Sequence, residues 1–177
     1  MFATDSTEET ESADAIEHLK LYVDEQGENN MASEDSIFLS NEDNYSASST
    51  LSSHYVENLF DWDVGTNWQE GVDGSGIGED VEINFADTQK ISGMAFYMGS
   101  WVSEQKYYEN NRPSVVTLQL DDEEFQLEFS DVMEKHYVYF SQPVAFNYIK
   151  LTIYEVYRGT VYDDTVISEI NIFPPAD

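Results

Sequence analysis

Apolar and polar residues alternate in several runs of this chain from Asn44 onward, and that period of two constrains the fold more than any other feature. In the clearest run, Val81, Ile83 and Phe85 alternate with polar neighbours. Successive side chains of a β-strand point to opposite faces of a sheet, so each such run predicts a strand with one buried face. We predict strands at residues 45–50, 81–85, 90–98, 116–120, 125–129, 136–141, 149–154 and 166–173.

These strands predict an all-β fold. About eight short strands at this spacing, with no convincing helix between them, are typical of an antiparallel β-sandwich or jelly roll. Residues 116–120 and 125–129 are predicted to form a hairpin, because Asp121 and Asp122 turn the chain between them. A chain of 177 residues is long enough for one such domain with its own hydrophobic core.

The first 43 residues have a different composition from the rest. They contain 13 acidic residues and one lysine, with Ser, Thr and Asn among the remainder. So charged a segment buries too little apolar surface to offset the entropy of ordering it. We therefore divide the chain into an acidic linker or stalk at residues 1–43 and a β-sandwich at residues 44–177.

Two pieces of the linker carry local structural signals. Asp14 followed by Glu17 resembles a capping box, and apolar residues then recur at helical spacing, which predicts a short helix over residues 14–25. Such a helix is too short to be stable unless it docks. Residues 36–39 are predicted to be an edge strand or a docking segment.

The charge of the chain limits its partners. Seven Lys and Arg residues against 36 Asp and Glu residues leave a formal net charge of −29. This charge repels phosphate backbones and anionic membranes, so nucleic acid and lipid headgroups are poor partners. Cysteine is absent, which excludes disulfides, thiolate metal sites and cysteine nucleophiles. No run approaches the roughly 18 apolar residues of a membrane span, so we expect no membrane insertion.

The glycine-rich stretch GVDGSGIGE, residues 71–79, raises the question of a phosphate-binding loop. Its spacing is G-x-G-x-G, and a predicted strand follows it where a dinucleotide site needs a helix N-terminus. It contains no lysine, and Glu70, Asp73 and Glu79 surround it with negative charge. We instead predict a tight loop that needs positive φ or close backbone approach, with its acidic ends anchored, Arg112 being one candidate partner.

Catalysis is not expected. The three histidines, His18, His54 and His136, are far apart in the sequence and do not have the spacing of a metal site. No Gly-x-Ser-x-Gly motif occurs. A carboxylate pair such as Glu70 and Glu79 could serve as the acid and nucleophile of a glycosidase, but a chance pair is expected in so acidic a chain.

Short motifs follow one another in a characteristic order between residues 44 and 173. They are Tyr45–Thr50, Glu57–Leu59, Asp61-x-Asp63, Thr66-x-Trp68, Glu70-Gly71, Gly78-Glu79, Asn110–Pro113, Gly159, Asp163–Thr165 and Ile167–Ile170. Their order and spacing resemble discoidin domains, also called coagulation factor five/eight C-type domains. In particular, they resemble the bacterial subgroup typified by the glycan-binding translocation domain of secreted NAD glycohydrolase toxins.

The resemblance implies a jelly-roll β-sandwich of the galactose-binding-domain type, with ligand-binding loops at one end. It also implies a non-catalytic module that binds a glycan or glycoconjugate outside a bacterial cell or on its surface. The acidic start of the sequence suggests that it follows a signal or anchor segment. Nothing resembles the toxin's catalytic portion, so NAD hydrolysis is not expected. The alternative is a protein-interaction or scaffolding domain of the cell envelope.

A calcium site is a second implication of the resemblance. In similar domains the loop around Asp61, Asp63 and Thr66 wraps a structural Ca²⁺ together with a late glutamate, which Glu169 matches here. The usual Asp-Gly-Asp is interrupted by Trp62 in this chain. The alternative is that Asp61 and Thr66 only cap the turn through backbone hydrogen bonds.

Sugar recognition needs an aromatic face and nearby polar groups, which two predicted loops supply. Trp68 is expected in the core, and Trp62 and Trp101 at the surface. An alternative is that the loop aromatics pack onto the sandwich, and that Arg112 is a structural clamp for Glu79 or Asp164. The predicted ligand-binding residues are Trp101, Tyr107, Tyr108, Asn111, Arg112, Arg158 and Tyr162, with Asn110 as a further polar group.

Overall fold

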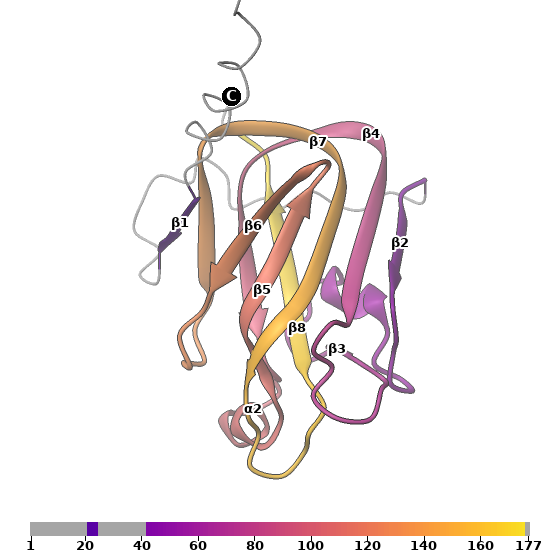
Figure 1. Cartoon of the computed structure of the whole chain (residues 1–177), viewed down its shortest axis with the longest axis vertical. Helices are drawn as coiled ribbons and strands as arrows, with labels where there is room; N and C mark the ends of the chain where they lie inside the picture. The colour runs from indigo at the N-terminus through magenta and orange to yellow at the C-terminus, as the bar shows by residue number, and fades with distance from the viewer. Residues whose placement is uncertain (1–20, 25–41, 176–177) are drawn as a thin grey trace, which may run out of the picture.

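The structure, a computed structural model, describes residues 21–24 and 42–175 (Figure 1). In chain order the elements of these residues are β1 (Leu21–Asp24), β2 (Asn44–Ala47), the 3-10 helix η1 (Val56–Leu59), β3 (Trp68–Gln69), β4 (Asp80–Met98), α2 (Glu104–Glu109), β5 (Arg112–Leu120), β6 (Glu123–Glu128), β7 (His136–Tyr157) and β8 (Val166–Phe173). Strands dominate, as the alternating pattern predicts.

All strand pairs are antiparallel, and two long strands organise them. The sheet order is β3-β8-β4-β7-β5-β6, with β1 added to β7 and β2 added to β4. β4 has 19 residues and β7 has 22, and their mutual register shifts between Asn84 and Gln89. Both strands arch over the top of the view in Figure 1. They therefore bend from one layer of the molecule into the other.

The pairing partners define the two layers. The first half of β4 pairs with β2, and the second half of β7 pairs with β5, which also pairs with β6. The second half of β4 pairs with β8, which pairs with β3, and the first half of β7 pairs with β1. The prediction of an antiparallel jelly-roll sandwich is confirmed. Four of the predicted short strands are halves of β4 and β7.

The core lies between the two layers and follows the period of two. On β5, Val116, Leu118 and Leu120 are at most 2% exposed, while the residues between them are half-buried. Val81, Ile83 and Phe85 of β4 share this core. Trp68 is also part of it at 1% exposure, which confirms its predicted place.

The predicted helix over residues 14–25 is wrong where the structure describes it. Leu21–Asp24 form β1, and each residue pairs with one of Tyr137–Phe140 in β7. A sheet edge offers backbone partners that outweigh the weak helical preference of so short a segment. Part of the predicted acidic linker is therefore in the sheet. The rest of the predicted helix and the segment 36–39 lie outside the described residues.

Candidate functional site

A cleft of about 400 Å³ lies at the end of the sandwich opposite the bends of β4 and β7. α2 and the β7–β8 loop lie at this end, at the bottom of the view in Figure 1. Four separate parts of the sequence line the cleft, so only the fold brings them together. The lining residues are Leu51, His54, Asn67, Gln69, Ser100, Val102, Lys106, Asn110, Tyr162, Asp164 and Val166.

Helix α2 forms one wall, and its sequence explains its start and its orientation. Ser103 is the N-cap, and its Oγ accepts a hydrogen bond from the Lys106 backbone N–H at 3.1 Å. Tyr107 faces inward at 1% exposure, and its hydroxyl donates to the Val132 carbonyl at 2.8 Å. The inward tyrosine fixes the helix on the sandwich and leaves Lys106 to line the cleft.

The β7–β8 loop forms the wall next to α2, and Asn111 holds this loop in place. The Asn111 Nδ2 donates to the Asp163 carbonyl at 2.6 Å, and its Oδ1 accepts from the Gly159 N–H at 2.7 Å. Asn111 is fully buried. It therefore positions the loop that presents Tyr162 and Asp164 to the cleft, without itself reaching the cleft.

The same loop lies directly against α2. The Glu109 carbonyl accepts hydrogen bonds from the Val161 and Tyr162 N–H groups at 3.1 and 2.8 Å. A Cβ at Gly159 would lie 2.4 Å from the Glu109 carbonyl oxygen, closer than any side chain allows. Glycine is therefore required at position 159 for this close approach.

Lys106 connects the two walls. Its Nζ lies 2.7 Å from the Glu109 Oε2 and 5.1 Å from the centre of the Tyr162 ring. The hydrogen bond between the two groups raises the pKa of Lys106 and lowers the pKa of Glu109. Both groups are therefore charged at neutral pH, and the lysine charge is already neutralised within the helix.

The opposite side of the cleft carries a histidine and an amide. The His54 Nδ1 lies 2.7 Å from the Asn67 Oδ1, and the Asn67 carbonyl accepts from the Asn58 Nδ2 at 2.8 Å. Because an amide oxygen only accepts, this contact makes Nδ1 the donor and leaves Nε2 as the acceptor of the neutral imidazole. This side thus offers an acceptor next to ordered amides.

Apolar side chains at the rim remain accessible to solvent. Leu51 is 37% exposed, Val102 is 58% exposed and Tyr162 is 44% exposed. Exposed apolar groups beside ordered polar groups suit a small ligand that has both an apolar face and hydroxyl groups. A phosphate or other dianion would lie beside Asp164 in the same cleft.

Of the predicted ligand-binding residues, Tyr162 lines the cleft, as does the further polar group Asn110, and the others do not. Trp101 is half-buried, and its indole N–H donates to the Met98 carbonyl at 3.0 Å. Tyr108 is 39% exposed and its ring meets Tyr107 edge-on. Arg158 is exposed and forms an ion pair with Asp163. Tyr107, Asn111 and Arg112 are buried.

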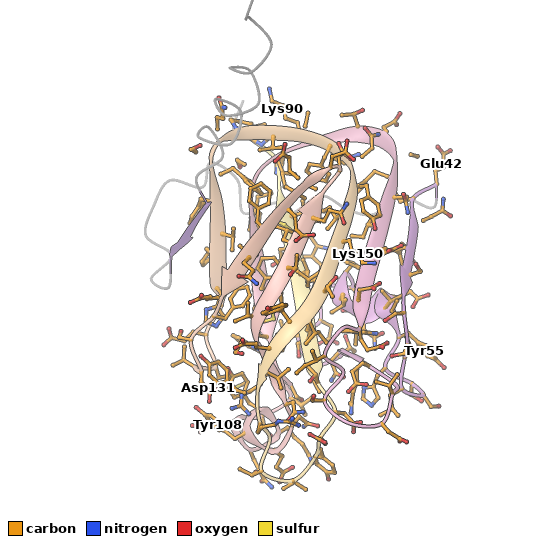
Figure 2. The ribbon with its side chains drawn as sticks, viewed as in Figure 1. Glu42, Tyr55, Lys90, Tyr108, Asp131 and Lys150 are labelled. Carbon is orange, nitrogen blue, oxygen red and sulfur yellow. The ribbon has the colours of Figure 1, made fainter. Side chains whose placement is uncertain are left out.

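Arg112 is a structural clamp, which was the predicted alternative to ligand binding. Its partner is neither of the two predicted acids, Glu79 and Asp164. Its Nε and Nη2 donate to the two carboxylate oxygens of Asp131 at 2.8 and 2.7 Å. Its Nη1 donates to the Asn110 carbonyl at 2.9 Å. This bidentate pair fixes the start of β5 to the loop after β6, both drawn near the labelled Asp131 in Figure 2.

Most of the residues that line the cleft were not predicted from the sequence. Asp164 lies in the motif Asp163–Thr165, and Lys106 directly precedes the predicted ligand residue Tyr107. The resemblance implies that these loops gather at a binding end, but it does not show which side chains face outward. A single histidine such as His54 gives no signal, because its partner Asn67 is fixed only by the fold.

The glycine-rich loop behaves as predicted, with other anchors. Gly74, Gly76 and Gly78 have φ of +105°, +61° and +96°. A Cβ at Gly76 would lie 2.3 Å from the Glu70 Cγ.

The acidic ends of the loop are anchored to other segments. Glu70 is fully buried, accepts a hydrogen bond from the Thr165 N–H at 3.1 Å, and has its pKa raised by burial. Glu79 accepts from the Ser48 hydroxyl at 2.6 Å. Neither acid binds Arg112.

The predicted calcium residues do come together. The Thr66 hydroxyl donates to the Asp61 Oδ2 at 2.7 Å, and the Glu169 Oε2 accepts from the Trp62 N–H at 3.1 Å. Glu169 is 2% exposed, and burial, with the charges of Asp61 and Asp63, raises its pKa to about 8. A buried carboxylate beside two others requires a proton or a cation.

The donor chemistry fits a hard cation, although the side chains alone do not complete a site. Among residues 21–24 and 42–175, no three His, Cys, Asp or Glu side chains are close enough to hold a metal by themselves. Ca²⁺ takes 6–8 oxygen ligands, of which carbonyls and water can supply several. Asp61, Asp63, Thr66 and Glu169 offer oxygens only, so they fit Ca²⁺ better than a softer metal.

Trp62 occupies the position where the resemblance expects glycine, and its backbone keeps the conformation of glycine. Its φ is +66°, in the left-handed region that bulky residues rarely adopt. The side chain is 44% exposed. A bulky residue thus holds a left-handed backbone conformation at this position, at a conformational cost.

Comparisons with known proteins agree with this architecture. The sequence model described as NAD glycohydrolase translocation F5/8 type C domain matches residues 9–173. The family 32 carbohydrate-binding module of Clostridium perfringens NanJ, solved with galactose, is 18% identical, with a TM-score of 0.59 over 75% of this chain and 93% of that one.

Two further solved structures are similar. The Clostridium perfringens module CpGH89CBM32-5, solved with GalNAc-β-1,3-galactose, is 13% identical, with a TM-score of 0.58 over 75% of this chain and 95% of that one. The family 32 module of AlyQ, solved with 4,5-unsaturated mannuronic acid, is 14% identical, with a TM-score of 0.51 over 73% and 93%. At these identities the likeness establishes the fold.

A comparison with curated proteins found no match. Among the described residues, none of the helices has the length and apolar character needed to span a membrane.

Proposed function

Because this chain belongs to the family of NAD glycohydrolase translocation F5/8 type C domains, we propose that it is a non-catalytic module that binds carbohydrate in the cleft between α2 and the β7–β8 loop. The observation that carries the proposal is the cleft itself. It places the exposed Tyr162 ring beside ordered polar groups at the end of the sandwich where the loops gather. The three similar structures named above are carbohydrate-binding modules, which supports the same assignment.

Binding would combine two interactions that a pyranose ring satisfies together. The apolar face of the sugar would pack against Tyr162, with Leu51 and Val102 completing the rim. Hydroxyl groups would donate to His54 and Asp164 and accept from amide groups in the cleft. Since Asn111 and the Arg112–Asp131 pair already fix the surrounding loops, little ordering entropy would be lost on binding.

The non-catalytic part of the proposal rests on the positions of potential catalytic groups. His136 is 1% exposed and packs against the Phe129 ring, and His54 is bound to Asn67. The acids Glu70 and Glu79 serve as anchors of the glycine-rich loop. We expect no product release from NAD or from a chromogenic glycoside, and turnover of either would overturn this part.

A glycan array with two tyrosine variants tests the binding proposal. We expect Tyr162→Ala to abolish glycan binding, while Tyr154→Ala leaves it unchanged, since Tyr154 is 52% exposed but lies on β7 outside the cleft. Both variants remove an exposed ring, so a general effect of losing tyrosine is controlled. Equal binding by Tyr162→Ala and the unaltered protein would refute the assignment of the cleft. Silence across all glycans would favour the alternative, a protein partner in the cell envelope.

A structural Ca²⁺ at Asp61, Asp63, Thr66 and Glu169 is part of the proposal. Its support is the buried Glu169 carboxylate beside two aspartates, together with an all-oxygen donor set. A bound cation would supply the positive charge that these carboxylates lack.

We also propose that the module acts outside a bacterial cell or on its surface, which the strongly acidic composition and the family assignment support.

A further inference from the structure

We propose that the cleft selects sugars by charge, so that a sugar with a free amine binds better than a neutral sugar, and a sugar with a carboxylate binds worst. This inference rests on the proposed carbohydrate-binding function and extends it to the class of ligand. It follows from which charged groups around the cleft are already paired.

The cations nearest the cleft are neutralised within the protein. Lys106 of α2 pairs with Glu109, at 2.7 Å between Nζ and Oε2. Arg112 at the start of β5 is 3% exposed and pairs with Asp131. Arg158 in the β7–β8 loop pairs with Asp163. The charge of each of these three cations is therefore balanced by a carboxylate of the protein.

The remaining described cations are engaged elsewhere. Lys150 on β7 pairs with Asp80 and Glu82, at 3.0 and 2.9 Å. The Lys135 Nζ lies over the Tyr137 ring, 4.7 Å from its centre. Lys90 is labelled at the opposite end of the molecule from Tyr108 and Asp131 in Figure 2. Each described lysine and arginine is thus paired with a carboxylate, held over an aromatic ring or placed at the other end of the molecule.

One carboxylate of the protein, that of Asp164, lies in the cleft without a cation to balance it among the described residues. Asp164 lines the cleft, and it forms no ion pair with any residue that the structure describes. Its charge also acts on the buried Glu70, whose pKa is raised by burial first and by Asp164 as a further cause. With Lys106 neutralised by Glu109, Asp164 leaves the cleft with a negative charge.

The consequence for a ligand follows from Coulomb attraction and repulsion. An ammonium group in the cleft would gain an attraction to Asp164, and a carboxylate there would be repelled by it. Exposed ion pairs contribute roughly 0.2–1 kcal/mol, which corresponds to an affinity ratio of up to about fivefold. The net charge of −29 acts in the same direction over longer distances at low salt.

A matched series of sugars tests the selection directly. Galactosamine, galactose and galacturonic acid, and the same three forms of glucose, are titrated by calorimetry. We expect the amine form to bind about three- to fivefold more tightly than the neutral form and the acid form more weakly than either. These ratios should shrink as ionic strength rises from about 0.01 M to 1 M, because the screening length falls from about 30 to 3 Å.

Two variants assign the effect to the cleft. Asp164→Asn should reduce the amine-to-neutral affinity ratio to about one, while Lys106→Gln, which removes the cation that balances the Glu109 charge, should increase it. Asp122→Asn removes the same charge from the exposed β5–β6 turn at the other end of β5, and should leave the ratio unchanged. Thermal melts confirm that each variant is folded.

The outcomes separate this inference from the function on which it rests. Tight binding of neutral sugar with equal or tighter binding of the acid form would overturn the charge selection and leave the carbohydrate-binding proposal intact. An unchanged ratio in Asp164→Asn would overturn the assignment to Asp164. Failure of every sugar in both series, and of the glycan array, would refute the proposed function and the inference with it.

Discussion

Two sets of polar residues at the loop end look alike in the sequence and have opposite roles in the structure. The buried set, Arg112, Asn111 and Glu70, is at most 3% exposed and holds loops to one another. The cleft set, here Tyr162, Lys106 and Asp164, lines the cavity. Residue types suited to recognition are thus used here mostly for support.

Burial, rather than residue type, separates the residues that support the loops from those that line the cleft. A buried arginine or asparagine must satisfy its hydrogen bonds inside the protein, so its loss lowers stability. An exposed tyrosine or aspartate can keep its interactions with water, so its loss changes binding while stability is almost unaffected. Variants in the buried set should therefore lower the free energy of unfolding, and variants in the cleft set should change ligand binding.

The two arginines provide the largest expected contrast. Arg112→Met should lower the free energy of unfolding by about 3 kcal/mol, because it removes a buried cation and leaves Asp131 and the Asn110 carbonyl without their donor. Arg158→Met should lower it by less than about 1 kcal/mol, because both partners of that ion pair are over 60% exposed. Urea denaturation measures both. Equal losses would refute the distinction.

The calcium proposal predicts the next largest effect. Ca²⁺ at 100 times its Kd should raise the free energy of unfolding by about 2.7 kcal/mol, measured as a higher Tm than in chelator. Glu169→Gln should remove most of this difference, whereas Glu155→Gln, an exposed glutamate on β7, should preserve it. Identical midpoints with calcium and with chelator would count against a metal site.

Asn111 tests the link between support and recognition. Asn111→Ala should cost about 2 kcal/mol of stability, because the Gly159 N–H and the Asp163 carbonyl lose a buried partner. It should also weaken glycan binding, because the loop that carries Tyr162 is released. Asn147→Ala, at an exposed asparagine, should change neither quantity. Full glycan binding by a destabilised Asn111→Ala would show that the loop does not depend on this residue.

The smallest expected effect concerns Trp62. Trp62→Gly should stabilise the protein by up to about 1 kcal/mol, because glycine adopts φ of +66° without the steric cost borne by a bulky residue. The same substitution at Trp101, which is half-buried and donates to the Met98 carbonyl, should destabilise it. Thermal melts in chelator measure both without a contribution from calcium.

Much of the fold could be predicted from the alternating pattern, since that pattern records which face of each strand is buried. Residues 166–173 were predicted as a strand and form β8. The continuity of β4 and β7 could not be predicted, because the polar segments at their bends look like ordinary turns. Nor could β1, because its pairing with β7 depends on residues more than 110 positions away.

The candidate site was less accessible to sequence reasoning. Tyr162 was predicted and lines the cleft, and the residues named for calcium do gather around Glu169. Three predicted ligand residues are buried instead, because tight loops need internal hydrogen-bond partners that Asn111 and Arg112 provide. Sequence order placed the loops at one end and could not assign the direction of each side chain.

The sandwich, its core and the tight glycine-rich loop could be predicted from the sequence alone, because local periodicity and backbone freedom depend on near neighbours in the chain. The strong negative charge was also fixed by composition. The pairing of Asp131 with Arg112, the anchoring of the β7–β8 loop by Asn111, and the lack of an ion-pair partner for Asp164 among the described residues depend on the tertiary structure. Those outcomes depend on burial and on contacts between distant segments, which the order of residues does not specify.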